Sequence, residues 1–281
     1  MKPLLGAHVS AAGGFDKALE RGEDLGAEVI QIFVSSPRSW RVIQPSAEVI
    51  TRYEAQKKNS SVKKVYAHGS YLVNLGTPKP DLLEKSKNSL KEELQVITTM
   101  GFEGLIFHVG SANGQGNFPL KQIATAIKGT LKAVPGNSQI ILENAAGGGG
   151  KVGSTPESLA EIMEAVNSPR VKVCYDTAHG FEAGLIANYT PQEIDKLLKR
   201  FDKTFGLKNL VALHINDSKT VFNSRHDRHE NLGKGYIGLT GFKNLAKEKR
   251  LAHTSWMLEV PGFENMGPDR KNMDILKKCF A

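Results

Sequence analysis

The stretch from His214 to Gly235 concentrates side chains that can do chemistry. It contains His214, Asp217, Lys219, Arg225, His226, Asp227, Arg228 and His229. Imidazole and carboxylate groups bind metal ions, whereas lysine and arginine bind phosphate, so this composition suggests phosphate chemistry at a metal centre. A polar loop on its own is more often simply solvated, so the interpretation depends on ligands supplied elsewhere in the chain.

Further metal-capable side chains stand at the ends of short apolar segments. They are His8, His68, His108, Glu143, Asp176, His214 and Glu259, with His179 three residues after Asp176. A lone histidine or glutamate at such a place usually makes a structural hydrogen bond or ion pair. Several packed together without a cation would repel one another or stay unsatisfied. Imidazole with carboxylate is the donor set that zinc, manganese or iron prefers.

Eight apolar, β-branched segments alternate with eight helical patterns along the chain. The expected strands are Leu4–Val9, Glu28–Val34, Lys64–His68, Leu105–Val109, Gln139–Glu143, Val171–Asp176, Leu210–Ile215 and Ser255–Val260. The expected helices lie near residues 15–25, 47–59, 81–100, 119–133, 156–166, 191–205, 240–249 and 267–279. Alternating strands and helices form parallel sheets, so the pattern predicts one α/β domain over residues 1–281 with the closed (β/α)8 architecture of a TIM barrel. A doubly wound open sheet is the alternative.

The carboxyl ends of the strands in such a barrel share one rim, where active sites lie. Residues two positions before each candidate ligand face the same way along a strand. These positions hold Tyr66, Ile106, Ile141, Cys174, Ala212 and Met257. Most are apolar and suit a barrel interior. We therefore expect the polar group as the top layer of an apolar column, with Cys174 as a buried core thiol rather than a nucleophile.

The loop after the seventh strand adds Asp227 and His229. Two residues apart in an extended chain, they face the same way and can bind one ion, with His179 from the loop after strand six. Nine candidate ligands, counted without His8, suit two or three ions that share a carboxylate. Clustered ions hydrolyse phosphodiesters without a side-chain nucleophile. The sequence has no G-x-S-x-G motif, and Gly147–Gly150 lacks the serine or threonine of a phosphate-binding loop.

The overall composition points to a polyanionic partner. The chain has 281 residues, a formal net charge of +8 and two cysteines, Cys174 and Cys279. The positive charge favours nucleic acid. Few cysteines argue against a disulfide scaffold and fit a reducing cytosol. The N-terminus lacks a signal-peptide pattern and no apolar run has the length of a membrane span, so we expect a cytoplasmic protein without a membrane partner.

Several segments resemble endonuclease IV, the metal-dependent apurinic/apyrimidinic (AP) endonuclease family of base excision repair. They are G-A-H-V-S-A-A-G-G at 6–14, H-G-S-Y-L-V-N-L-G at 68–76, F-H-V-G-S at 107–111, L-E-N at 142–144, D-T-A-H at 176–179, H-I-N-D-S-K at 214–219, R-H-D-R-H-E-N-L-G-K-G at 225–235 and L-E-V-P at 258–261. The resemblance covers almost the whole chain. The segment with D-R-H and the G-x-G turn is highly specific, because related sugar isomerases lack it.

The resemblance implies a TIM barrel with three zinc ions, which manganese or iron can replace in part. The implied ligands are His68, His108 and Glu143 for the first ion, Glu143, Asp176, His214 and Glu259 for the second, and His179, Asp227 and His229 for the third. The implied reaction cleaves the phosphodiester 5′ to an abasic site and leaves a 3′-hydroxyl and a 5′-deoxyribose phosphate, with trimming of blocked 3′ ends. A metal-bound hydroxide is the implied nucleophile, and Glu143 is the implied catalytic, bridging carboxylate.

The resemblance also implies a monomer that binds duplex DNA containing abasic or 3′-blocked lesions. Arg38 resembles the arginine that the family inserts at the lesion, and Tyr71 and Leu72 resemble the pair that wedges into the base stack. Such a wedge offsets the cost of unstacking a flipped nucleotide. The cations expected to contact phosphate are Lys219, Arg225 and Arg228.

The chain departs from the family pattern near the expected lesion pocket. Gly69 stands where H-A-P-Y or H-D-S-Y has alanine or aspartate, and Ala145 and Gly148 replace the threonine and glutamine of E-N-T-A-G-Q-G. These changes affect no metal ligand but put side activities, such as incision beside damaged bases, in doubt. The rival functions are a two-metal sugar isomerase or epimerase and a non-catalytic DNA-damage-binding protein. The third ligand set argues against the first rival, and the complete set of ligand types argues against the second.

Overall fold

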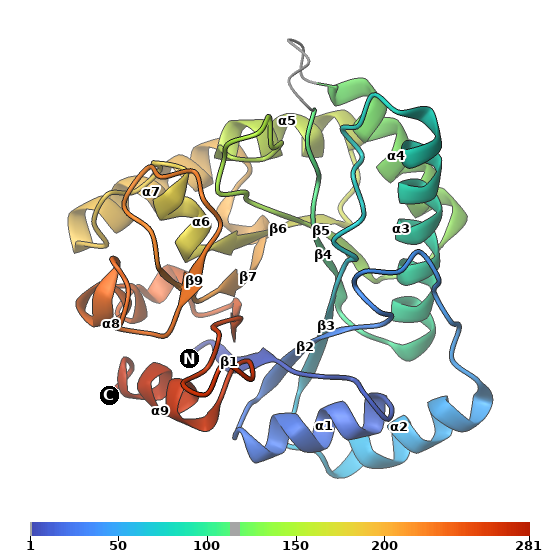
Figure 1. The fold of residues 1–281 in the computed structure, drawn as a ribbon, viewed down its shortest axis with the longest axis horizontal. Coiled ribbons are helices and arrows are strands. Elements are labelled where there is room, and N and C mark those ends of the chain that lie inside the picture. The colour runs from blue at the N-terminus through green and yellow to red at the C-terminus, as the bar shows by residue number, and fades with distance from the viewer. Residues whose placement is uncertain (1, 113–118) are drawn as a thin grey trace.

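The computed structural model describes residues 2–112 and 119–281, and its main strands close into a parallel barrel (Figure 1). The barrel strands are β1 (Leu4–His8), β2 (Val29–Phe33), β3 (Lys64–His68), β4 (Gly104–His108), β5 (Gln139–Glu143), β6 (Val171–Asp176), β7 (Leu210–His214) and β10 (Ser255–Leu258). Their order around the barrel is β1-β10-β7-β6-β5-β4-β3-β2, and β1 pairs with β2 to close it. The TIM-barrel prediction is confirmed, and the open sheet is excluded.

Helices follow the strands and surround the barrel (Figure 1). They are α1 (Phe15–Asp24), α2 (Ala47–Asn59), α3 (Pro80–Met100), α4 (Leu120–Ala133), α5 (Pro156–Val166), α6 (Thr177–Glu182), α7 (Pro191–Thr204), α8 (Gly238–Ala246) and α9 (Arg270–Lys278), with the 3-10 helices η1 (Leu207–Asn209) and η2 (Lys249–Leu251). The sequence missed α6, because six residues are too short to show a helical period. Across the described part of the chain, no helix is both long and apolar enough to cross a membrane.

Capping chemistry sets where several helices begin. Thr155 accepts a hydrogen bond from the Ser158 backbone N–H at 3.2 Å, and Thr190 caps α7 through the backbone N–H of Glu193 at 3.3 Å. Proline follows each threonine at a position that needs no backbone N–H. These caps fix the ends of the loops that join the barrel rim to α5 and α7.

The barrel interior is an apolar column, as the strand alternation predicted. Its buried members are Val29, Tyr66, Ile106, Ile141, Cys174, Ala212 and Met257. Cys174 is a buried core thiol, as expected, and both cysteines are free. A second, larger apolar core lies between the strands and the surrounding helices. Residues two positions beyond the interior column face the mouth of the barrel.

The segment after β7 folds into a small ribbon that the sequence did not predict. Strand β8 (Asp217–Ser218) pairs antiparallel with β9 (His229–Glu230). The ribbon brings His229 back toward the barrel after an excursion through residues 219–228. The sequence predicted a loop after β7, because two-residue strands carry no detectable alternation of apolar and polar residues.

Candidate metal centre

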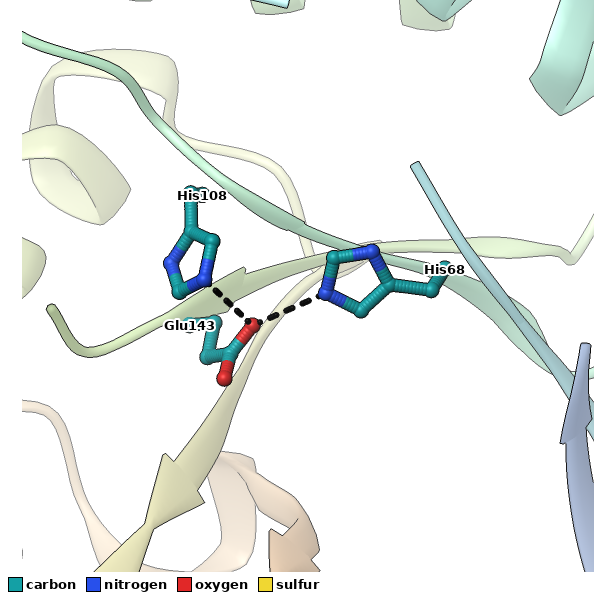
Figure 2. Close-up of side chains that lie close together, drawn as sticks. All are labelled: His68, His108 and Glu143. Carbon is teal, nitrogen blue, oxygen red and sulfur yellow. Dashed lines mark hydrogen bonds and ion pairs between the residues drawn. The ribbon is translucent and has the colours of Figure 1, made fainter. Parts of the chain in front are cut away.

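Glu143 lies fully buried at the end of β5, and imidazole nitrogens face both of its carboxylate oxygens. His68 Nε2 is 3.1 Å and His108 Nε2 is 3.6 Å from Glu143 Oε2. Figure 2 shows both rings directed at this same oxygen. On the other side, His214 Nδ1 is 2.9 Å from Glu143 Oε1. Glu143 is thus placed between two groups of histidines.

Two further carboxylates surround the inward nitrogen of His214. Its Nδ1 atom lies 3.2 Å from Glu259 Oε2 and 3.9 Å from Asp176 Oδ2. Asn216 holds both in place, because its amide nitrogen donates to Asp176 Oδ2 at 2.7 Å and its amide oxygen accepts from the Glu259 backbone N–H at 2.8 Å. Sequence reasoning missed Asn216, although it follows His214 by two residues.

His179, Asp227 and His229 meet beside this group. His179 Nε2 is 3.2 Å from Asp227 Oδ1 and 3.4 Å from His229 Nε2, and His229 Nε2 is 3.8 Å from Asp227 Oδ1. His179 lies in helix α6 rather than in a loop, which corrects the expectation from sequence. The helix begins there because the Asp176 carboxylate accepts from the His179 backbone N–H at 2.8 Å.

All nine predicted ligands therefore converge at the barrel mouth. Their donor atoms fall into four overlapping groups within 4.8 Å: His68, His108 and Glu143; Glu143, Asp176, His214 and Glu259; His108, His179 and Asp227; and Asp176, His179 and His229. The first two coincide with the ligand sets expected for the first and second ions. The other two share His179, so the third set also approaches His108 and Asp176.

The protonation of the rings fits a metal-binding role. The Nδ1 atoms of His68, His179 and His229 contact the carbonyl oxygens of Gly69, Asn144 and Glu259 at 2.8, 3.0 and 3.3 Å. A carbonyl oxygen only accepts, so each Nδ1 carries a proton, and Nε2 is the ring nitrogen left to bind a metal ion. Two such Nε2 atoms 3.4 Å apart, with carboxylates around them, form a donor set that suits zinc.

His108 supplies a second sign of fit. Its Nδ1 atom is buried and has no hydrogen-bond partner among the described residues. Burial lowers the pKa of His108 to about 4, because the charged ring is poorly solvated there. The ring is therefore neutral at pH 7, which is the form that binds metal ions.

Three carboxyl groups of the cluster, those of Glu143, Asp227 and Glu259, have lowered pKa values. Burial alone would raise the pKa values of Glu143, Asp227 and Glu259, but the facing histidines outweigh burial. The pKa of each carboxyl group lies below its usual range as a result. Burial alone would lower the pKa values of His68, His179 and His214, but the facing acidic groups raise them above the ordinary value. A zinc ion would therefore bind ionised carboxylates and displace the inward ring protons, so zinc binding should strengthen as the pH rises.

Asp217 could bind a metal by residue type, but the structure gives it another role. Its buried carboxylate accepts hydrogen bonds from the backbone N–H groups of Ser218, Gly233, Gly235, Ile237 and Gly238 at 2.9–3.3 Å. Both oxygens are engaged, and Asp217 belongs to none of the metal-capable groups. Asp217 therefore folds the turn that follows the ribbon.

Glu182, which sequence reasoning also missed, anchors the segment that carries Asp227. Its Oε1 atom accepts from the hydroxyls of Ser218 and Thr220 at 2.8 and 3.2 Å and from the Arg228 backbone N–H at 3.2 Å. Burial raises the pKa of Glu182, and these donors oppose the increase. A glutamate in a short helix gives no sequence signal for this role.

The predicted DNA contacts surround the mouth but are not joined into one cluster. Arg38, Lys219, Arg225 and Arg228 are exposed, and Leu72 is half-buried. Tyr71 is 63% exposed, which leaves its ring available to a ligand. Two hydrogen bonds to Pro37 O, from the Ser70 hydroxyl at 2.9 Å and the Tyr71 backbone N–H at 3.1 Å, bind the loop of Tyr71 to that of Arg38.

A cavity of about 660 Å³ opens over the cluster. His68, His108, Asp227 and Glu259 contribute to its floor, and Tyr71, Lys151 and Arg228 line it as well. Lys151 Nζ lies 3.6 Å from Asp227 Oδ2 and was not among the predicted site residues. The cavity therefore combines candidate metal ligands with cations and an aromatic ring.

The departures from the family pattern have local explanations. A Cβ atom on Gly69 would lie 2.9 Å from Phe107 Cβ, closer than packed carbons approach. Gly148 has a φ of 76°, and a Cβ there would lie 3.0 Å from the carbonyl oxygen of Arg225. The glycine run thus lets the Arg225 segment approach closely, as the sequence suggested.

The barrel and its His/carboxylate mouth define a class of protein, the xylose isomerase-like TIM barrels, whose family model matches residues 19–279. Within that class, the chain belongs to the endonuclease IV family, a family of metal-dependent nucleases. It is 36% identical over 276 residues to the "Probable endonuclease 4" of Halothermothrix orenii, covering 98% of this chain and 99% of that one. The "Probable endonuclease 4" of Aquifex aeolicus is also 36% identical, over 99% of this chain and 98% of that one.

Solved structures agree with this assignment. The crystal structure of endonuclease IV from Thermus thermophilus matches with a TM-score of 0.86 and 32% identity, covering 99% of this chain and 98% of that chain. A D-tagatose 3-epimerase-like protein matches with a TM-score of 0.70 at 17% identity, covering 98% of this chain and 96% of that one. The second likeness concerns the fold alone.

Proposed function

We propose that this protein is a zinc-dependent AP endonuclease that cleaves duplex DNA on the 5′ side of abasic sites. The products would be a 3′-hydroxyl and a 5′-deoxyribose phosphate, and the same site would trim blocked 3′ ends. The observation that carries the proposal is the meeting of His179, Asp227 and His229 beside the Glu143 cluster. It supplies donors beyond a two-metal site, in a chain of the endonuclease IV family.

The nine clustered side chains are the proposed ligands of three ions. His68, His108 and Glu143 would hold one ion, and Glu143, Asp176, His214 and Glu259 a second. His179, Asp227 and His229, whose donor atoms lie 3.2–3.8 Å from one another, would hold a third. Metal ions bound there would make hydroxide available near neutral pH and stabilise the charge that develops on a phosphodiester. Zinc is the proposed metal because the donors are imidazoles and carboxylates, and manganese or iron share that preference in part.

The protein's own contribution is to select and hold the lesion. Tyr71 and Leu72 are the proposed wedge, and Arg38 is the proposed residue that enters the duplex, since their loops are hydrogen-bonded together. The Tyr71 ring packs edge-on against Phe33 with centroids 5.3 Å apart, which supports it from behind. An abasic nucleotide flips at low cost because it has no base to unstack.

Cations on the segment after β7 are the proposed contacts to the DNA backbone. Lys219, Arg225 and Arg228 are exposed, and Arg228 also lines the cavity above the cluster. The formal charge of +8 supports a polyanionic substrate. We further propose that residues 1–281 work as one domain and as a monomer, because all nine ligands come from one chain, and that the enzyme acts in the cytoplasm.

The decisive experiment is incision of a duplex that contains a single abasic site. We expect one cut on the 5′ side with zinc present, and none after treatment with a zinc chelator. The Glu143→Gln variant should bind the duplex but cut it more than about 100-fold more slowly, because loss of outer-shell residues alone costs 10- to 100-fold. Glu161→Gln, a change on an exposed face of α5, is the matched control and should cut normally.

An uncut duplex in the presence of zinc would refute the proposal. Turnover of a ketose or aldose instead would favour the sugar-isomerase function. Tight binding of the lesion with full zinc content but no incision would favour a damage-binding protein.

A further inference from the structure

Gln31 lies at the barrel mouth among the candidate metal ligands, but its side chain ends in an amide. It lies in β2, two residues beyond the interior residue Val29, and its side chain is fully buried. The strand register places Gln31 beside His8 of β1 and beside Tyr66 of β3, two residues before His68. A buried amide there has to hydrogen-bond with the cluster around it.

Glu259 determines how the Gln31 amide is oriented. The amide Nε2 lies 2.5 Å from Glu259 Oε1 and 2.9 Å from His8 Nδ1, and the amide Oε1 lies 2.8 Å from His214 Nε2. An ionised carboxylate only accepts hydrogen bonds, so the NH₂ group must face Glu259. The oxygen of the amide must then face His214.

This orientation determines the proton positions on two rings. The amide oxygen only accepts, so His214 carries a proton on Nε2. Its Nδ1 atom, 2.9 Å from Glu143 Oε1 and 3.2 Å from Glu259 Oε2, is then the ring nitrogen left to bind a metal ion together with these carboxylates. The NH₂ group only donates, so His8 accepts at Nδ1 and carries its proton on Nε2. His8 Nδ1 is 3.6 Å from Glu259 Oε1, too far for a direct hydrogen bond.

We propose that Gln31 is a positioning residue that sets the tautomers of His214 and His8 together. It holds His214 in the form that binds metal through Nδ1, and it leaves the Nε2–H of His8 as a hydrogen-bond donor to a phosphate oxygen of the substrate. His8 suits that contact because it lines both the 660 Å³ cavity over the cluster and an adjoining cavity of about 810 Å³. The inference rests on the proposed metal-dependent nuclease function.

Two substitutions separate the two effects. Gln31→Met keeps the length of the side chain but removes donor and acceptor, so zinc should bind about 10- to 100-fold more weakly at one site. Gln31→Glu keeps an acceptor for His214, and its other oxygen must share one proton with Glu259, because two ionised carboxylates cannot lie 2.5 Å apart. With that proton directed at Glu259, the same oxygen offers His8 an acceptor in place of a donor, so the His8 proton should move to Nδ1 while that of His214 stays on Nε2. Gln122→Met is the matched control, because within residues 2–112 and 119–281 the Gln122 amide bonds the backbone of Leu75 and Thr77 and no residue of the cluster.

The readouts are zinc content after dialysis against graded chelator and ¹⁵N–¹H spectra of the ring nitrogens in histidine-labelled protein. The Gln122→Met control should match the wild type in both. Unchanged zinc affinity in Gln31→Met, or a His8 proton that stays on Nε2 in Gln31→Glu, would overturn the proposal. If Gln31→Met fails to fold by circular dichroism, the His8 signal of Gln31→Glu decides alone. Failure of the proposed nuclease function would give a different result from failure of the Gln31 proposal, because the wild type itself would then bind no zinc or leave the abasic duplex uncut.

Discussion

Glu93 is a buried carboxyl group behind the loop that carries Tyr71. Its Oε1 atom accepts from the Ser70 backbone N–H at 3.2 Å, whereas its buried Oε2 atom has no hydrogen-bond partner in the described part of the chain. Burial raises the pKa of Glu93 to about 7, and the Ser70 N–H and the charge of His68 only partly oppose it. Helix α3 is thus tied to the proposed wedge loop by a group that titrates near neutral pH.

This residue predicts a pH dependence of stability. The folded-state pKa of Glu93 lies above its ordinary value of 4.5. The free energy of unfolding is therefore at its highest below pH 4.5, where Glu93 is protonated in both states, and it falls as the pH rises through about 7. The loss is on the order of 3 kcal/mol in the free energy of unfolding. Glu93→Gln should therefore match the wild type near pH 5 and exceed it by about that amount near pH 8, measured by urea unfolding. An equal difference at both pH values would contradict the assigned pKa.

The inward ring nitrogen of each histidine shows where prediction at the residue scale stops. His68 and His179 turn Nε2 inward because carbonyl oxygens hold their Nδ1 protons, whereas His214 turns Nδ1 inward because Gln31 holds its Nε2 proton. The strand pattern was sufficient to predict that these rings meet. It could not predict the tautomers, since the partner atoms of His179 and His214 come from other segments of the chain, and the direction of the Gly69 carbonyl beside His68 depends on the loop backbone.

At the scale of elements, the segment after β7 is organised by Asp217. Five backbone N–H groups converge on its carboxylate, one from Ser218 in β8 and four from residues 233–238 after β9. A Cβ on Gly235 would lie 2.2 Å from the Ser218 carbonyl oxygen, so only glycine fits this close approach. Sequence composition singled out the segment as functional, but residue type alone suggested a metal ligand where there is a fold-determining carboxylate.

Asp217→Asn tests this role. The amide would turn an NH₂ group toward backbone donors, so several charge-assisted hydrogen bonds would be lost, and the free energy of unfolding should fall by about 3 kcal/mol. Zinc content should fall as well, because Asp227 and His229 lie on the same segment. Asp202→Asn, which alters an exposed carboxylate that accepts one backbone hydrogen bond from Leu207, should have little effect. Stability equal to the wild type would show that Asp217 does not organise the segment.

At the scale of the whole molecule, the positive charge predicts how DNA binding responds to salt. Each phosphate contact contributes a slope of about −0.9 to a plot of log K against log salt concentration for duplex DNA. Replacing both Arg225 and Arg228 by alanine should make the slope shallower by about 2. Fluorescence anisotropy of a labelled abasic duplex measures it, in the Glu143→Gln background so that the duplex is not cut.

A matched pair of substitutions makes this test specific. Lys196 and Lys199 lie on α7 with side chains that are each 72% exposed, and each pairs with an acidic residue of the same helix. Their replacement by alanine removes the same formal charge but should leave the slope unchanged. Equal effects of the two double variants would point to net charge rather than to a DNA contact.

The barrel as a whole was predictable because its signal is repeated. Each barrel strand carries an apolar run. Six interior residues of the barrel were predicted by one rule, that side chains two positions apart on a strand face the same way, and all six lie in the buried column. The ribbon β8–β9, helix α6 and the anchor Glu182 were not predictable, since they depend on short-range geometry or on partners distant in sequence. Extending the same rule to β2 would have identified Gln31.

The closure of the barrel has a consequence for how the protein is made. Strand β10 pairs with both β1 and β7, and Glu259 follows it directly. A nascent chain that has not yet reached this strand on the ribosome has an open sheet and lacks a proposed ligand. Premature termination before residue 255 would leave the same state. The nuclease activity would therefore arise only after translation has passed the final barrel strand, so incomplete chains would not cut the chromosome.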